Sequence, residues 1–173
     1  MNKDAKVCEV MTGGGGPMIL LQQEAIRFWR GATDYIDSPG NSDYDAILNT
    51  DAFVIERYGR EMLILDDSHA DSYLVTLPDG EVAVVQNIAS DNTPLELLYS
   101  LRQNPPTHDF AFRVLDSSVR LIVGTDDGDY APNAWWSGHG FRDAPILPGS
   151  KRCRIFESED ASVTVISSDT ARE

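Results

Sequence analysis

The sequence predicts an α+β protein with mainly antiparallel sheet and two or three short helices. Short runs of β-branched and aromatic residues recur along the chain, as in residues 119–123, and they are separated by turn signals such as Pro78-Asp79-Gly80. Helical spacing is confined to short segments. The 173 residues, 42% of them hydrophobic, suffice for one domain with a buried core. We expect a single domain over 1–173, with sub-domains 1–104 (α+β) and 107–173 (β-rich) as the alternative.

Residues typical of helix ends or helix starts occur at three places in the first two thirds of the chain. Gly31 follows a short helical pattern and is typical of a helix end. Ser42 or Asp43 is placed to begin a second helix, and Thr93 or Asn92 a third, with Pro94 at its first position. We therefore expect helices at 24–30, 43–48 and 95–101.

The strands are expected between these helices and after them. Gly59 and the Pro78-Asp79-Gly80 turn each join two apolar runs, which predicts two hairpins. Residues 125–150 are rich in acids, glycine and proline and are predicted to be a long connection. The expected strands are 7–11, 18–21, 52–58, 61–65, 73–77, 81–88, 110–114, 119–123, 152–156 and 163–166.

The glycine run Gly13–Gly16 suggests a phosphate-binding loop at first sight. Such a loop follows a strand and leads into a helix, and the nucleotide version ends in Gly-Lys-Ser/Thr. Here the glycines precede the apolar run 18–21, and no lysine follows them. The order of elements therefore favours a structural turn, with no nucleotide cofactor.

Charge is the strongest compositional feature. The chain carries 28 acidic and 14 basic residues, a net charge of −14, and the first 103 residues hold 17 of the acids and 7 of the bases. A field of this sign repels nucleic acid and anionic membranes and speeds encounter with a basic partner. It also serves solubility, whatever the protein binds.

Neither a metal nor a cofactor site is indicated. His69, His108 and His139 are widely spaced, and Cys153 lies 14 positions from His139, so zinc-ligand spacing is missing. Cys8 and Cys153 are distant in sequence, so they are either free thiols of a reducing compartment or a pair. No long apolar segment or export signal is recognised, which suggests a cytoplasmic protein.

One stretch could support catalysis. Asp66, Asp67 and His69 gather carboxylates and an imidazole at the end of an expected strand, as general acid–base chemistry requires. The competing interpretation is a solvated turn, and no nucleophile motif accompanies the stretch.

Binding residues are sought among loop acids and exposed aromatics. Trp135 and Trp136 stand in the long connection, where an aromatic either anchors a partner or plugs the edge of the core. Trp29 is expected in the core. The candidate partner-binding residues are Asp43, Asp45, Asp66, Asp67, Asp71, Trp135 and Trp136.

Four sequence features occur together between residues 12 and 90. They are Gly15-Gly16-Pro17 before the strand 18–21, Trp29-Arg30-Gly31 at the helix end, Asp43-Tyr44-Asp45, and a hairpin 55–65 that closes on Leu65-Asp66-Asp67. In these features the chain resembles the immunity protein 21 family of bacterial polymorphic toxin systems, over roughly residues 12–90. The resemblance implies a non-enzymatic cytoplasmic antidote, a monomer or homodimer, that binds and blocks one cognate toxin.

Three hypotheses follow from the sequence. The leading one is an immunity protein that occludes the active site of a basic toxin domain, without binding nucleic acid or membrane. The second is a small hydrolase-like enzyme that uses Asp66, Asp67 and His69. The third is a β-rich ligand-binding module, or one that dimerises through a strand edge.

Overall fold

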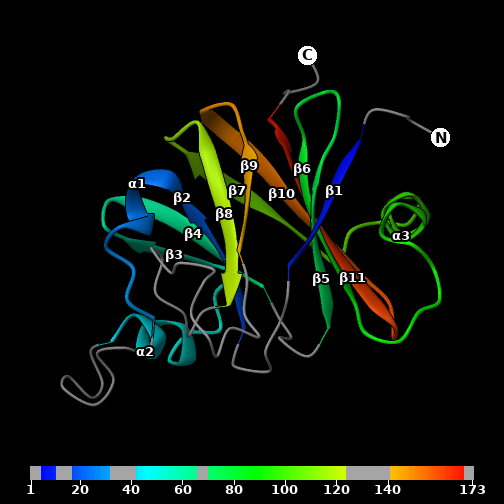
Figure 1. Ribbon diagram of the computed structural model, residues 1–173, viewed down its shortest axis with the longest axis horizontal. Coiled ribbons are helices and arrows are strands. Elements are labelled where there is room, and N and C mark those ends of the chain that lie inside the picture. Colours follow the sequence, from blue (N-terminus) through cyan, green and yellow to red (C-terminus); the bar gives the residue numbers. More distant parts are fainter. Residues whose placement is uncertain (1–4, 11–16, 32–41, 66–69, 124–140, 170–173) are drawn as a thin grey trace.

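Two antiparallel sheets packed face to face form the body of the protein. The computed structural model describes residues 5–10, 17–31, 42–65, 70–123 and 141–169. Eleven strands and three short helices lie in these ranges, so the α+β, mainly antiparallel class is confirmed. Figure 1 shows the two sheets crossing, with α1 and α2 on one side of the molecule and α3 on the other.

The six-stranded sheet has the order β1-β5-β6-β11-β10-β7, and all of its pairings are antiparallel. Its strands are β1 (Lys6–Val10), β5 (Asp71–Thr76), β6 (Val82–Asn87), β7 (His108–Val114), β10 (Gly149–Glu157) and β11 (Ala161–Ser168).

The five-stranded sheet has the order β3-β4-β2-β8-β9 and is likewise antiparallel. Its strands are β2 (Met18–Gln22), β3 (Val54–Arg57), β4 (Arg60–Leu65), β8 (Ser118–Val123) and β9 (Arg142–Pro145). Both sheets combine strands from before and after Pro105-Pro106.

The helices are α1 (Gln23–Ile26), α2 (Asp43–Leu48) and α3 (Pro94–Leu101). Ser42 and Thr93 cap α2 and α3 with complete capping boxes, which confirms the expected starts. The helix expected over 24–30 is shorter than predicted. It ends at Ile26, and beyond it the Arg30 amide donates to the Asp43 carboxylate; Gly31 has a φ of +54°.

The core between the sheets follows from strand alternation. Met18 and Leu20 of β2 face Val82, Val84 and residues of the other sheet, whereas Ile19 and Leu21 point outward. All five residues of β2 are buried because helices cover its outer face as well. The interior also contains Cys153, which is free, as is the half-buried Cys8.

A polar corner joins the two sheets at one end. The Gln22 side chain is fully buried; it donates to the carbonyl oxygens of Glu61 (2.7 Å) and Arg113 (2.9 Å) and accepts from the Leu115 amide (2.7 Å). Asp116 accepts from the Glu24 amide and from Arg60, each at 2.8 Å. Since every one of these bonds links distant segments, the corner fixes how the two sheets meet.

Candidate functional site

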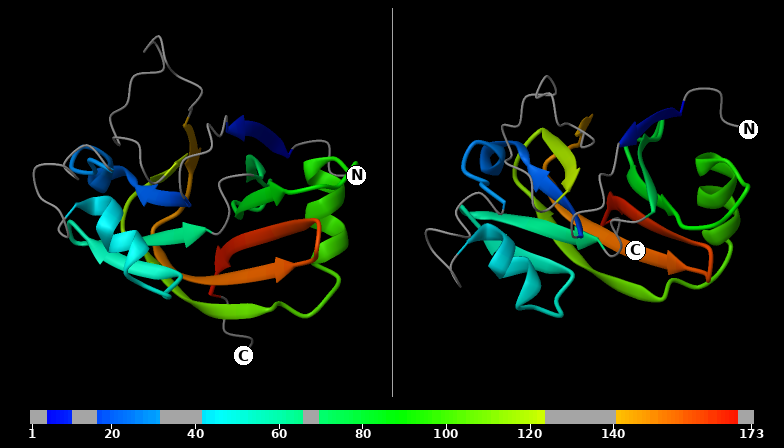
Figure 2. Two further views of the ribbon diagram at one scale, coloured as in Figure 1. Left: turned by 90° about the horizontal axis from the view of Figure 1, so that it is seen from below. Right: turned by 60° about the horizontal axis from the view of Figure 1, so that its bottom comes forward.

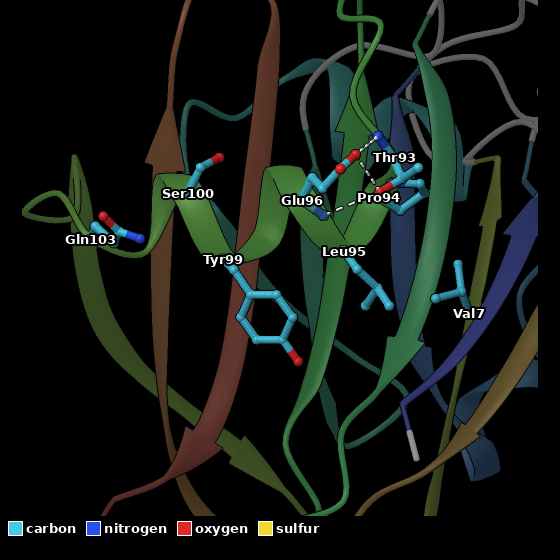
Figure 3. A pocket seen from close by; sticks show the side chains of 8 residues that line it. All are labelled: Val7, Thr93, Pro94, Leu95, Glu96, Tyr99, Ser100 and Gln103. Atoms are coloured by element: carbon cyan, nitrogen blue, oxygen red, sulfur yellow. Dashed lines mark hydrogen bonds between the residues drawn. The ribbon is translucent and has the colours of Figure 1, made fainter. Parts of the chain in front are cut away.

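The candidate site is a hollow between α3 and the edge strand β1 on the outer face of the six-stranded sheet. Its volume is about 740 Å³, and it is lined by Val7 of β1 and, on and around α3, by Thr93, Pro94, Leu95, Glu96, Tyr99, Ser100 and Gln103. Figure 3 shows Leu95 and Tyr99 pointing from the helix to the same side, with Val7 pointing from β1 toward Leu95. The lining is therefore apolar on both walls.

The shortness of α3 explains the hollow. Six strands about 4.8 Å apart span about 24 Å, whereas a helix of eight residues is about 12 Å long and about 10 Å wide. The buried face of α3 (Leu97, Leu98) packs on the middle of the sheet, on Val85 of β6 and Val163 of β11. Among the residues that the structure describes, no helix lies over the strands on either side of this contact.

The two uncovered margins differ in chemistry. On the β7–β10 side the outward residues are charged: Arg152 forms an ion pair with Asp109, and Arg154 donates to Ser167. On the β1 side the outward residues are Val7, which is 38% exposed, and Tyr73 of β5, which packs against the apolar cluster under α3. A solvated ion-pair surface needs no partner, whereas exposed apolar side chains beside a hollow are typical of binding sites.

Carboxylates border the apolar side. Glu9 lies opposite Tyr73 in the β1–β5 register. Burial raises the pKa of Tyr73, and the negative charges of Asp71 and Glu9 raise it further, which places both carboxylates close to the phenol. Glu96 on α3 accepts from the Thr93 amide and hydroxyl, and these hydrogen bonds lower the pKa of Glu96. The hollow thus combines apolar walls with an anionic margin.

The opposite outer face, on the five-stranded sheet, is closed. Trp29, Ile26 and Ile47 pack on Ile19 and Ile122, and Trp29 is fully buried, as expected. Asp43 fixes this cover because its carboxylate accepts from Arg57 (2.6 Å), from the Tyr58 hydroxyl (2.7 Å) and from the Arg30 amide (2.8 Å).

The hairpin turn between β3 and β4 presents these groups to Asp43. Tyr58 and Gly59 have φ of +56° and +69°, as the two central residues of a type I′ turn do. Burial and the hydrogen bond to Asp43 both raise the pKa of Tyr58. Burial lowers the pKa of Arg57. The hydrogen bonds to Asp43 and Tyr58 raise this pKa by more, so the net shift is upward. Tyr58 also stacks on Phe28, with ring centroids 5.5 Å apart.

The sequence-based site residues are placed very differently by the structure. Asp43 and Asp45 are 3% and 8% exposed, and Asp45 completes the capping box of Ser42, so both carboxylates serve the fold. Asp71 is exposed at the start of β5, near the anionic margin of the hollow. Asp66, Asp67, His69, Trp135 and Trp136 lie outside the described residues, as does Gly13–Gly16.

Sequence reasoning missed the hollow itself. Its residues carry no motif, and Leu95 and Tyr99 read as an ordinary helix face. One signal was available: an eight-residue amphipathic helix followed by Pro105-Pro106 is too short to cover a wide sheet.

Within the described ranges, no cluster of three or more His, Cys, Asp or Glu side chains is arranged to hold a metal ion. None of the helices described has the length and apolarity that a membrane crossing requires. Comparisons of the chain with models of protein families, with curated proteins and with solved structures return no match.

Proposed function

We propose that this protein is a cytoplasmic immunity protein that binds one cognate bacterial toxin domain and neutralises it by occluding the toxin's active site. The observation that carries the proposal furthest is the hollow between α3 and β1: apolar walls bordered by Glu9, Asp71 and Glu96, on a chain of net charge −14. The family resemblance supplies the class of partner, and the hollow supplies a surface that suits it.

The mechanism is stoichiometric binding without chemistry. The negative field steers a basic toxin domain toward the protein and raises the association rate. Desolvation of the apolar residues, led by Tyr99 and Leu95, then holds the complex, because buried aromatic contacts carry most of the energy of an interface. A toxin covered in this way cannot admit its substrate.

The closed face is less suited to a basic partner. Its exposed aromatic residues, Phe28 and Tyr58, lie beside Arg27 and Arg57. The Tyr58 hydroxyl and Arg57 are also engaged by Asp43. Arg27 is likewise paired with Glu24, at 3.1 Å, so these aromatic rings lie beside ion pairs and not beside an anionic margin, and we assign the contact to the other face.

The test uses the protein encoded directly beside this gene. The toxin domain at its C-terminus is purified and mixed with the immunity protein, and the complex is measured by size-exclusion chromatography with light scattering. We expect a 1:1 complex, loss of the toxin's activity, and growth of cells that express both proteins. Absence of a complex together with absence of growth rescue would contradict the proposal.

A small-molecule binding role is the second candidate. A volume of about 740 Å³ lies within the range of pockets that hold drug-sized apolar ligands. A screen of fluorescent apolar probes discriminates the two functions: tight binding of such a probe, blocked by Tyr99→Ala, favours the ligand-binding module, whereas displacement of a weak probe by the toxin domain favours the immunity protein.

A further inference from the structure

In the part of the chain that the structure describes, no strand pairs with the edge of β1 that faces away from β5. β1 pairs with β5 over five residues, from Lys6 opposite Thr76 to Val10 opposite Ser72. It is the terminal strand of its sheet in the described part of the chain. In an antiparallel sheet, every second residue of such a strand directs its N–H and C=O outward, which is a template for one more strand.

The hollow borders β1 on the face of the sheet that carries α3. Figure 2 shows β1 on the side of the molecule that carries α3, and Val7 of β1 lines the hollow together with Leu95 and Tyr99. Because the side chains of a strand alternate between the two faces, a strand added beside β1 would place every second side chain on the face that carries α3, next to Val7. Backbone pairing and a side-chain pocket would thus be available to the same segment, as in known cases of strand addition.

The charges near the edge of β1 favour an added strand of positive net charge. Glu9 shares the outward face with Val7, and Asp71 lies near it on the neighbouring strand. Lys6 alternates to the other face of β1, and Arg102 after α3 is paired with Glu81 at 2.9 Å. An added strand with basic side chains is therefore attracted, and an acidic one is repelled.

We propose that an extended, basic segment of the toxin pairs with β1 as a seventh strand of the sheet and places apolar side chains beside Val7, at the border of the hollow. This inference rests on the proposed function and names the mode of contact. A second copy of this chain fits the edge less well than a basic segment, because both copies carry a net charge of −14 and repel each other.

Three synthetic peptides test the inference without the toxin. The first has eight residues that alternate Lys and Val, with a fluorescent label and blocked ends. The second has the same sequence with N-methyl groups at every second residue, which keeps its charge but removes the hydrogen bonds of one edge. The third replaces Lys by Glu. We expect fluorescence anisotropy to give at least tenfold weaker binding for the N-methylated peptide, and none for the acidic one.

Matched variants locate the contact. Val7→Lys places a charge on the edge strand, and Leu48→Lys makes the same charge change at an exposed leucine of α2 on the opposite side. We expect Val7→Lys to weaken binding of the first peptide at least tenfold and Leu48→Lys to change it less than twofold. Tyr99→Ala serves as a second test inside the hollow, with a loss of at least fivefold.

Equal binding of the first two peptides, or equal effects of the two lysine substitutions, would overturn strand addition. A dimer of the free protein that Val7→Lys dissociates would also overturn it, because a second copy of the chain would then pair with β1. Failure of the proposed function is separate: it is seen as absent toxin neutralisation by the wild-type protein, whichever way the peptides behave. Neutralisation that survives Val7→Lys would retain the function and reject this edge.

Discussion

The outer faces of the two sheets are covered by helices in different ways. On the five-stranded sheet, α1 and α2 bury Trp29 and Ile47, and the carboxylate of Asp43 ties the cover to the β3–β4 turn. On the six-stranded sheet, α3 is the one helix of the described ranges that rests on the middle strands, and Val7 and Tyr99 lie beside a hollow. The closed face therefore stabilises the fold, and the open face is where a partner gains most by covering apolar surface.

Trp29 gives the largest expected effect in this comparison. Trp29→Ala empties a fully buried site and is expected to lower the free energy of unfolding by about 3–5 kcal/mol. Tyr99→Ala on the open face removes a partly exposed ring and is expected to cost less than about 1.5 kcal/mol. Urea unfolding at equal slopes measures both; similar losses for the two variants would mean that α3 seals its face as well.

The next largest difference is expected between two Asp→Ala substitutions, one on each face. Asp43→Ala leaves Arg57, Tyr58 and the Arg30 amide without their acceptor and is expected to cost about 2–4 kcal/mol. Asp71→Ala removes an exposed charge and is expected to change stability by no more than about 0.5 kcal/mol. Thermal and urea unfolding measure the pair, and a marginal effect of Asp43→Ala would show that the closed face is held by packing alone.

The two helix caps provide a finer comparison, because both are complete capping boxes. Ser42 is buried with Asp45, so Ser42→Ala removes both the cap of α2 and a hydroxyl that donates to a buried carboxylate, and it is expected to cost about 1–2 kcal/mol. Thr93 is exposed with Glu96, so Thr93→Ala is expected to cost about 0.5–1 kcal/mol, mainly by fraying α3. A larger loss for Thr93→Ala, measured by urea unfolding, would reverse the assignment of closed and open faces.

The two thiols give the smallest effect on stability and differ in reactivity. Burial raises the pKa of Cys153 to about 12, and the negative charge of Asp109 adds to this shift. At pH 8 we expect a thiol reagent to modify half-buried Cys8 on β1, and Cys153 only after unfolding; the variant Cys8→Ser isolates the second thiol.

The pH dependence of Cys153 has a definite sign. Below about pH 8.5 both folded and unfolded chains keep the proton, so the full stability is present. Between that value and about pH 12 the unfolded chain binds fewer protons, so the free energy of unfolding falls as pH rises. Cys153→Val is expected to lessen this alkaline loss, and an unchanged slope would contradict the assignment.

Local signals in the sequence were sufficient for the fold class and most elements. The Pro78-Asp79-Gly80 turn joins β5 and β6, and Thr93 and Pro94 begin α3, because these residue types act on their own backbone. Strand β9 was missed: Arg142–Pro145 has charged residues and a proline, and only Ala144 is buried, as an edge strand allows.

Long-range pairing and burial could not be predicted in the same way. β2 pairs with β8, about 100 residues later, and neither sequence indicates which strand it pairs with. Asp43 reads as an exposed acid of a helix start, and its burial comes from Arg57 and Tyr58 on a distant hairpin. The hollow depends on the width of a sheet whose strands come from both ends of the chain, so it has no local signal.

Amide hydrogen exchange of the complex with the neighbouring toxin domain tests the central claim most directly, because it compares both faces at once. We expect slower exchange in β1 (Lys6–Val10) and α3 (Pro94–Leu101) when the toxin is bound, with unchanged exchange in α2 (Asp43–Leu48) and the β3–β4 turn. Protection of α2 and the Tyr58 turn, with β1 and α3 unchanged, would contradict the account and assign the partner to the closed face.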